Sequence, residues 1–243
     1  MEAKERIILA LDVDTAEKAI AAGKLLKDHV GAFKIGMELY NACGPSIVEE
    51  FQRMGANVFV DLKFHDIPNT VASASRIMTR LGAWMFNVHA SGGQEMMKSA
   101  VAAAAEEAAS LGRKKPLMLA VTVLTSMNLQ QLREDVGIPA ESVEDVVVRW
   151  AKMAQACGMD GVVCSPKEAA ALRKACGEDF LLVTPGIRPA WAAANDQKRI
   201  TTPKDAVQLG SSYMVIGRPI VKADDPVEAA KRIIRELEEI ESC

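Results

Sequence analysis

The sequence predicts an α/β fold, a single (β/α)8 TIM barrel that spans residues 1–243 as one domain. Short apolar runs alternate with helical segments eight times, which is typical of repeated βα units and a parallel sheet. No glycine-rich dinucleotide fingerprint follows the first run, which disfavours the alternative, an open doubly wound sheet. Neither a linker nor a low-complexity tract divides the chain.

The eight apolar runs are the expected strands, and polar or glycine residues lie at or beside their ends. In chain order they are IILALDV (7–13), GAFKIG (31–36), NVFVDLK (57–63), WMFNVH (84–89), LMLAVTVL (117–124), GVVCS (161–165), FLLVTPG (180–186) and YMVIGR (213–218). The segments between them are amphipathic or rich in alanine, as in 93–110, and favour helices. Residues 128–157 form a longer connection, in which we expect two helical pieces.

Composition and charge exclude several classes of protein. The 243 residues are 49% hydrophobic, which suffices for a sizeable core. The net charge of -3 comes from acids and bases mixed along the chain, so no basic stripe is available for a nucleic-acid backbone. No apolar run approaches the roughly 20 uncharged residues that cross a bilayer. We therefore expect neither a nucleic-acid partner nor a membrane.

The N-terminus and the cysteines bear on the compartment. The stretch MEAKERIILALDVD lacks the small-residue cleavage site of a signal peptide. The five cysteines are odd in number and scattered, without a CxxC pair, so neither a disulfide framework nor a zinc site is indicated. A reducing, cytoplasmic environment fits best.

Polar residues gather where the expected strands end. In a barrel, catalytic groups lie at the carboxyl ends of the strands, where the βα loops begin. Following each strand to its end gives Asp12, Lys34, Asp61, Lys63, His89, Thr125, Ser126, Ser165, Pro185, Arg188, Gly217 and Arg218. These residues should converge on one rim.

Alternation along the third strand indicates which of its side chains enter the barrel. Successive strand residues face opposite sides, so Phe59, Asp61 and Lys63 share one face. The aliphatic residues between them suit the helix layer, which leaves the charged residues pointing into the barrel mouth. The same parity places Asp12 and Lys34 on inner faces, and the small neighbours of Lys34 leave it room to reach across.

A structural ion-pair network is the alternative interpretation of these charges. Burying charges costs several kcal/mol each unless they are well paired. Because three strands end in such groups, a functional site is favoured. His65 is interpreted first as hydrogen-bonded within its loop, with catalysis as the alternative, and His65 and His89 are both left outside the expected site. No two of the three histidines have metal-ligand spacing.

The last two units predict a phosphate site. TPGIRP (184–189) covers the end of the seventh strand and the start of its loop, and IGRP ends the eighth strand. The loops after these strands recurrently bind phosphate in this fold. Arg218 would pair with the dianion and Gly217 would let the backbone approach. Surface charge is the alternative for Arg188 and Arg218. The long loop that follows Arg188 is a candidate lid.

Six motifs follow one another along the chain: LALDVD, FKIG, DLKFHDIPNT, TVLTSM, TPGIRP with DQKR, and IGRP. Together they resemble the orotidine 5'-phosphate decarboxylase family over essentially the whole chain, and the pattern DxKxxDIPNT is highly specific. The resemblance implies a barrel that decarboxylates orotidine 5'-phosphate, a small-molecule substrate, to UMP in the last step of de novo pyrimidine synthesis.

The resemblance also implies the roles of particular residues. The catalytic tetrad around the substrate carboxylate would be Lys34, Asp61, Lys63 and Asp66. Asp12 and Lys34 would contact the ribose, and Thr125 and Ser126 would contact the pyrimidine. Gln197, Gly217 and Arg218 would bind the phosphate, with Pro185 and Arg188 nearby. Ile67 and Thr70 would come from the partner subunit of a homodimer.

The segment after the third strand gives a second reason to expect a shared site. Pro68 fixes its own φ and biases Ile67 away from helix, so this segment should project outward before Asn69 or Thr70 begins the next helix. Asp66 lies in this turn, where it is placed to enter a neighbour's site across a two-fold axis.

The expected chemistry requires neither a cofactor nor a metal. No flavin, pyridoxal or thiamine motif is present to delocalise a carbanion. Lys63 would instead face the developing negative charge as a cation and then protonate it.

Two rival functions are open. Metal-dependent relatives, such as 3-keto-gulonate-phosphate decarboxylase and hexulose-phosphate synthase, share a DxK motif but place a glutamate at the second strand to hold Mg²⁺, where this chain has Lys34. A catalytically silent nucleotide-binding regulator should have lost a tetrad residue, and the chain keeps all of them.

Overall fold

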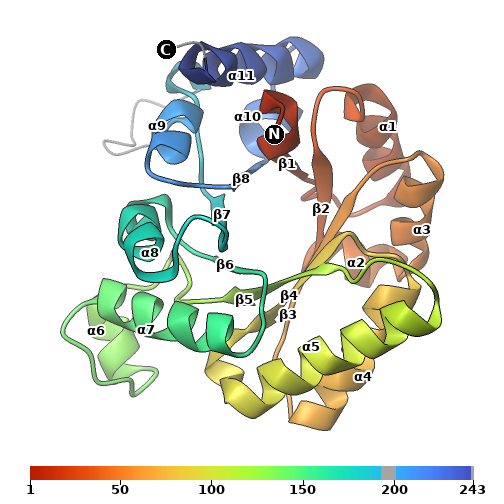
Figure 1. Cartoon of the computed structure of the whole chain (residues 1–243). Helices are drawn as coiled ribbons and strands as arrows, with labels where there is room; N and C mark the ends of the chain where they lie inside the picture. The colour runs from red at the N-terminus through yellow and green to blue at the C-terminus, as the bar shows by residue number, and fades with distance from the viewer. Residues whose placement is uncertain (193–200, 242–243) are drawn as a thin grey trace.

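A computed structural model describes residues 1–192 and 201–241. At its centre is a closed barrel of parallel strands that pair in sequence order, with β8 closing on β1 (Figure 1). The strands are β1 (Ile7–Ala10), β2 (Ala32–Gly36), β3 (Val58–Phe64), β4 (Met85–His89), β5 (Leu117–Val121), β6 (Gly161–Val163), β7 (Leu181–Pro185) and β8 (Tyr213–Ile216). The predicted (β/α)8 barrel is confirmed, and every strand overlaps its predicted run.

Helices surround the barrel, as Figure 1 shows. They are α1 (Ala16–Leu26), α2 (Met37–Cys43), α3 (Ser46–Arg53), α4 (Pro68–Arg80), α5 (Gly93–Ser110), α6 (Leu129–Glu134), α7 (Val143–Ala156), α8 (Ala169–Cys176), α9 (Pro203–Gln208), α10 (Arg218–Val221) and α11 (Pro226–Glu241). In the part of the chain that is described, none is long and apolar enough to cross a membrane.

Helix caps explain the two helices between β5 and β6, which confirm the prediction of two helical pieces there. Asn128 accepts a hydrogen bond from the N–H of Gln131 at 2.9 Å and begins α6. Ser142 accepts one from the N–H of Asp145 at 3.1 Å and begins α7. These side chains satisfy amide groups that have no partner in the first turn of a helix.

Strand alternation separates two apolar cores. The interior of the barrel is filled by Ile8, Ala10, Ala32, Phe59, Met85, Leu119, Val183, Tyr213 and Val215. Residues of the opposite parity, such as Val58 and Val60, pack in the layer beneath the helices. The inward position of Phe59 therefore agrees with the predicted parity of β3, and the filled interior forms a floor beneath the barrel mouth.

The strands differ from the predicted runs by one to three residues at an end, and the start of α4 also differs. Helix α4 begins at Pro68, before Asn69, because proline at the first helical position has a favourable φ and needs no partner for an N–H group. Strands β1 and β5 end three residues earlier than predicted, at Ala10 and Val121, although the next residue of each still donates its N–H to the neighbouring strand.

Candidate active site

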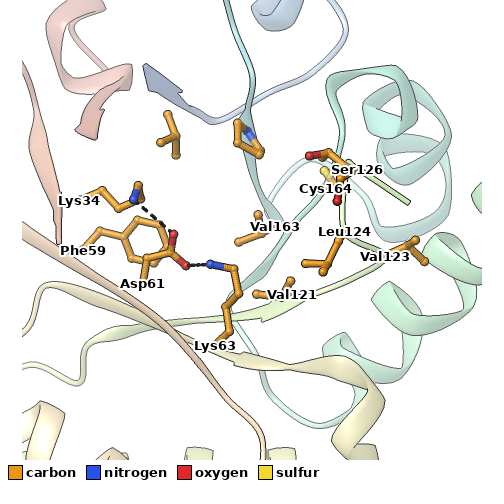
Figure 2. A pocket seen from close by; sticks show the side chains of 13 residues that line it. Lys34, Phe59, Asp61, Lys63, Val121, Val123, Leu124, Ser126, Val163 and Cys164 are labelled. Atoms are coloured by element: carbon orange, nitrogen blue, oxygen red, sulfur yellow. Dashed lines mark hydrogen bonds and ion pairs between the residues drawn. The ribbon is translucent and has the colours of Figure 1, made fainter. Parts of the chain in front are cut away.

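A cavity of about 250 Å³ opens at the carboxyl ends of the strands (Figure 2). Its lining residues are Lys34, Phe59, Asp61, Lys63, Val121, Val123, Leu124, Thr125, Ser126, Val163, Cys164, Pro185 and Val215. Figure 2 shows the charged side chains on one side and the loop after β5 on the opposite side. The cavity therefore combines one charged wall with a mainly apolar one, which is typical of sites for small polar molecules.

The carboxylate of Asp61 lies between two ammonium groups. Lys63 Nζ donates a hydrogen bond to Oδ1 of Asp61 at 2.7 Å, and Lys34 Nζ lies 3.6 Å from Oδ2. Lys34 Nζ also donates to Oδ1 of Asp12 at 3.3 Å. The side chains of Lys34 and Asp61 are only 12% and 14% exposed, so water and salt screen this pair weakly, whereas Asp12 is 63% exposed and its contact is screened more.

Opposing effects set the protonation of Asp61. Burial by itself raises the pKa of its carboxyl group. The charges of Lys34 and Lys63, with hydrogen bonds from Lys63 and Asn87, outweigh burial and hold the pKa below its ordinary value. Asp61 is therefore an ionised carboxylate at neutral pH, and the site carries a fixed electric field.

The backbone of β3 is irregular where the charges lie. Val60 pairs with Phe86 and Phe64 with Val88, so three residues of β3 lie opposite one residue of β4. Among the described residues, Lys63 is the one non-glycine residue with a positive φ, +53°. Bulges of this kind redirect side chains. Both charged side chains reach the cavity as predicted, but through a bulge instead of regular alternation.

Asn87 on β4 is a residue of the site that the sequence analysis missed. Its side chain is fully buried, its Nδ2 donates to Oδ1 of Asp61 at 2.7 Å, and its Oδ1 accepts from the backbone N–H of Lys63 at 2.8 Å. A signal was present in the sequence, because Asn87 has the parity of Met85, which faces the barrel interior. Applied to the fourth strand, the alternation argument identifies a polar residue beneath the rim.

Gly36 leaves the space that the Lys34 ammonium group occupies. A Cβ atom at position 36 would lie 2.9 Å from Nζ of Lys34, which is closer than an ordinary contact. The small neighbour predicted from the sequence therefore determines where the lysine ends.

Arg188 and Arg218 lie together in a second cavity of about 310 Å³, whose other lining residues are Trp191, Ala192, Pro219, Lys222 and Ala223. Three cationic side chains can hold a dianion through charge-assisted hydrogen bonds. The sequence analysis missed Lys222, which follows α10 and has no strand pattern around it. Gln197 and most of the candidate lid lie outside the described residues.

Gly217 lies where the last strand approaches the first. A Cβ atom at this position would lie 3.3 Å from Cβ of Ala10. The absence of a side chain thus lets the end of β8 pass close to β1, on the side of the barrel where Asp12 lies.

Asp66, Ile67 and Thr70 lie outside the cavity of their own chain. The whole segment 65–70 is exposed, and Ile67 is 67% exposed despite its apolar side chain. The Oδ1 atom of Asp66 accepts a hydrogen bond from the N–H of Ile67 at 2.6 Å. The fourth residue of the expected tetrad is therefore separate from the other three within one chain.

His65 and His89 stack beside the rim with ring centroids 5.5 Å apart, and neither lines the cavity. Nδ1 of His89 lies 2.7 Å from Oγ of Ser91. Burial, with the nearby charges of His65 and Lys63, lowers the pKa of His89 to about 4, so its ring is neutral at neutral pH. Across residues 1–192 and 201–241, no three His, Cys, Asp or Glu side chains are grouped as metal ligands.

Known proteins resemble this chain over nearly its full length. The family model described as "Orotidine 5'-phosphate decarboxylase / HUMPS family" matches residues 5–233. Orotidine 5'-phosphate decarboxylase of Syntrophomonas wolfei is 60% identical over 98% of this chain and 100% of the relative, and that of Heliobacterium modesticaldum is 52% identical over 98% of each. The crystal structure of the Lactobacillus acidophilus enzyme superposes with a TM-score of 0.85 at 40% identity, covering 95% of this chain and 98% of the other.

Proposed function

The chain belongs to the orotidine 5'-phosphate decarboxylase / HUMPS family, and from this premise we propose that it converts orotidine 5'-phosphate to UMP with the charges of its own side chains, without a metal or an organic cofactor. It is a decarboxylase of pyrimidine biosynthesis, the activity for which its curated relatives are named. The observation that carries the proposed mechanism is Asp61, held between Lys34 and Lys63 in the cavity.

Lys63 stabilises the negative charge that decarboxylation creates. When the bond from C6 to the carboxylate breaks, CO2 leaves and the electron pair remains on C6. A cation fixed opposite that carbon stabilises the charge without reorganisation during the reaction. The ammonium group of Lys63 then gives a proton to C6, which forms the C6–H bond of UMP, and the neutral amine regains a proton from water.

Asp61 acts on both the lysine and the substrate. It holds Nζ of Lys63 at 2.7 Å and so fixes the direction of the proton donor. Its own negative charge also opposes the substrate carboxylate, and this repulsion is relieved as CO2 leaves. Because only the ground state contains the second carboxylate, the interaction lowers the barrier instead of strengthening substrate binding.

The rest of the substrate is bound by groups around the two cavities. Asp12 and Lys34 contact the ribose hydroxyls, and Thr125 and Ser126 contact the edge of the pyrimidine beside Pro185. The phosphate is bound by Arg218 and Gly217 with Gln197, and Arg188 lies nearby. The proximity of Arg188 to Arg218 supports this assignment, because both line one cavity.

The site is completed by a second copy of the chain. In the proposed homodimer, Asp66, Ile67 and Thr70 enter the partner's cavity across a two-fold axis. The exposure of segment 65–70, with Ile67 at its centre, supports this arrangement, because an apolar side chain at such a position gains stability when a partner covers it.

The rival functions are less well supported. The family description also includes HUMPS enzymes, but a metal site at β2 would meet the ammonium of Lys34, which repels a divalent cation. A silent nucleotide-binding regulator has no need for an aspartate held between two lysines in the cavity, since grouping partly buried charges carries a desolvation cost.

The test is to follow the loss of absorbance when protein treated with EDTA meets orotidine 5'-phosphate. We expect turnover to persist without metal, and Lys63→Ala to lower it at least about a thousandfold while the Kd for UMP changes far less. Lys115→Ala is the matched control, because Lys115 pairs with Asp160 at 2.6 Å and is as exposed as Lys63, but lies at the amino ends of the strands.

Two outcomes would contradict the proposal. Activity that disappears with EDTA and returns with Mg²⁺ would make the chain a metal-dependent enzyme. A loss below about a hundredfold in Lys63→Ala, smaller than general acid catalysis commonly supplies, would remove Lys63 from the role of proton donor.

A further inference from the structure

Asn87 is an amide buried in the middle of an otherwise apolar strand. Its side chain has no exposed surface, and its neighbours Phe86 and Val88 are equally buried. A buried amide is unfavourable unless its donors and acceptor are paired. Where its hydrogen bonds go therefore indicates why asparagine is present at this position.

Asn87 fills the gap that the bulge of β3 leaves in the β3–β4 ladder. It is the single β4 residue that faces Asp61, Leu62 and Lys63. In place of a regular backbone ladder, its side-chain oxygen accepts the N–H of Lys63 at 2.8 Å, and its side-chain nitrogen donates to Asp61 at 2.7 Å. The side-chain amide of Asn87 therefore binds both Asp61 and Lys63, the first and last residues of the bulge.

These two contacts fix the orientation of the amide. If the oxygen and nitrogen of Asn87 were exchanged, the oxygen would face the carboxylate of Asp61 and the NH2 group would face the N–H of Lys63, so both contacts would be repulsive. The bonded orientation also gives Oδ1 of Asp61 two donors, Nδ2 of Asn87 and Nζ of Lys63. Rotation of the Asp61 carboxylate would therefore also displace the ammonium group of Lys63.

We propose that Asn87 is a positioning residue for decarboxylation, which holds the left-handed backbone of Lys63 and the carboxylate plane of Asp61 so that the Lys63 ammonium points into the cavity. The backbone of a non-glycine residue is strained in the left-handed region, and the surrounding structure must hold it there. The inference rests on the proposed function, in which Lys63 protonates the product carbanion.

The experiment compares Asn87→Ala and Asn87→Asp with the wild type. Asn57→Ala is the control for loss of an asparagine side chain away from the cavity, because the exposed Asn57 donates to the carbonyl of Gly31 at 3.2 Å just before the opposite end of β3. For each folded variant, kcat, KM, the Kd for UMP and the melting temperature are measured. We expect kcat of Asn87→Ala to fall about a hundredfold, as a displacement of about 1 Å can cause, with little change in the Kd for UMP, and kcat of Asn57→Ala to remain within about threefold of the wild type.

Asn87→Asp provides a second measurement, the pH dependence of kcat relative to the wild type, which would not change if Asn87 only stabilised the fold. The introduced carboxyl group can still accept the N–H of Lys63, but it replaces a donor to Asp61 with a second acid. Two adjacent carboxyls share one proton and cannot both ionise easily. When it is protonated, the new group donates as the amide does. We therefore expect the kcat of this variant, relative to wild type, to recover as pH falls from 8 to 5, by up to about tenfold per pH unit above the pKa of the pair.

Each outcome decides the inference. A relative kcat of Asn87→Asp that does not change with pH, a kcat of Asn87→Ala within about threefold of wild type, or failure of both variants to fold would each overturn it and make Asn87 a structural residue. Lys63→Ala, assayed in parallel, separates this from the proposed function. An active Lys63→Ala enzyme refutes the proposed role of Lys63, on which the inference rests, whereas an inactive one beside an active Asn87→Ala refutes only the role of Asn87.

Discussion

Gly36→Ala should separate stability from activity in this barrel. Apart from its chain neighbours, the described residue that a Cβ at position 36 meets within 4 Å is Lys34, whose Nζ would lie 2.9 Å away. An ordinary contact needs at least 0.5 Å more, so the ammonium must move. Because Nζ is the flexible end of a long side chain, it can move without disturbing the core.

The two consequences have different magnitudes. Gly36 has φ -91°, which alanine adopts readily, so a gain of about 0.4–1 kcal/mol from the less flexible unfolded chain offsets the small preference for glycine at the start of α2. The free energy of unfolding should change by less than about 1 kcal/mol. In contrast, the contacts of Lys34 with Asp61 at 3.6 Å and Asp12 at 3.3 Å should both change, and displacement by about 1 Å can cost up to a hundredfold in turnover.

A double-mutant cycle tests this reasoning. Denaturant unfolding gives the stability, and the absorbance assay with orotidine 5'-phosphate gives kcat/KM for Gly36→Ala, Lys34→Ala and the double variant. If the alanine acts through the ammonium group, the double variant should be no less active than Lys34→Ala alone. Losses that multiply, or a Gly36→Ala enzyme within twofold of wild type, would refute the argument.

Other predictions address the dimer, the phosphate and the response to pH. When Lys63→Ala and Asp66→Asn chains exchange subunits, one site of the heterodimer carries neither mutation, so activity should approach half that of the wild-type dimer; an inactive heterodimer would place Asp66 in the site of its own chain. Arg218→Ala should raise the Kd for UMP at least about tenfold, by loss of a charged hydrogen bond, and Lys222→Ala should raise it less; an unchanged Kd in the arginine variant would contradict the phosphate assignment. Burial raises the pKa of Glu168 to about 7, so its contribution to stability is present below its ordinary pKa of 4.5 and is lost as pH rises through 7. Glu168→Gln should therefore raise the melting temperature more at pH 8 than at pH 5. The corresponding gain in the free energy of unfolding is at most about 3 kcal/mol. An equal rise in melting temperature at both pH values would contradict this.

The barrel and its inner faces were predictable because they depend on local periodicity. Alternation follows from the extended backbone itself, so the inward positions of Phe59 and Lys34 could be predicted without knowledge of their neighbours. The charges at the strand ends were predictable for a related reason, since parallel strands bring their carboxyl ends to one rim.

The bulge at Lys63 was not predictable from the same rule. Its positive φ occurs where β3 pairs irregularly with β4, and its N–H donates to the side chain of Asn87 across the gap, a contact between residues far apart in the sequence. The pattern around Lys63 contains no glycine to signal a left-handed residue. In the same way, Lys222 joins Arg188 and Arg218 only through tertiary folding, because it lies in no strand and has no periodic neighbours.

The closure of β1 on β8 joins the first strand that the ribosome makes to the last. Asp12 follows the first strand and Arg218 follows the last, so the residues proposed to bind the ribose and the phosphate are made at nearly opposite times by the ribosome. A nascent chain that stops at β7 already holds Asp61 and Lys63, but it exposes two unpaired strand edges, which readily pair with other chains. Both edges disappear only when β8 pairs with β1 and β7, so the last strand completes the barrel and the proposed phosphate site together.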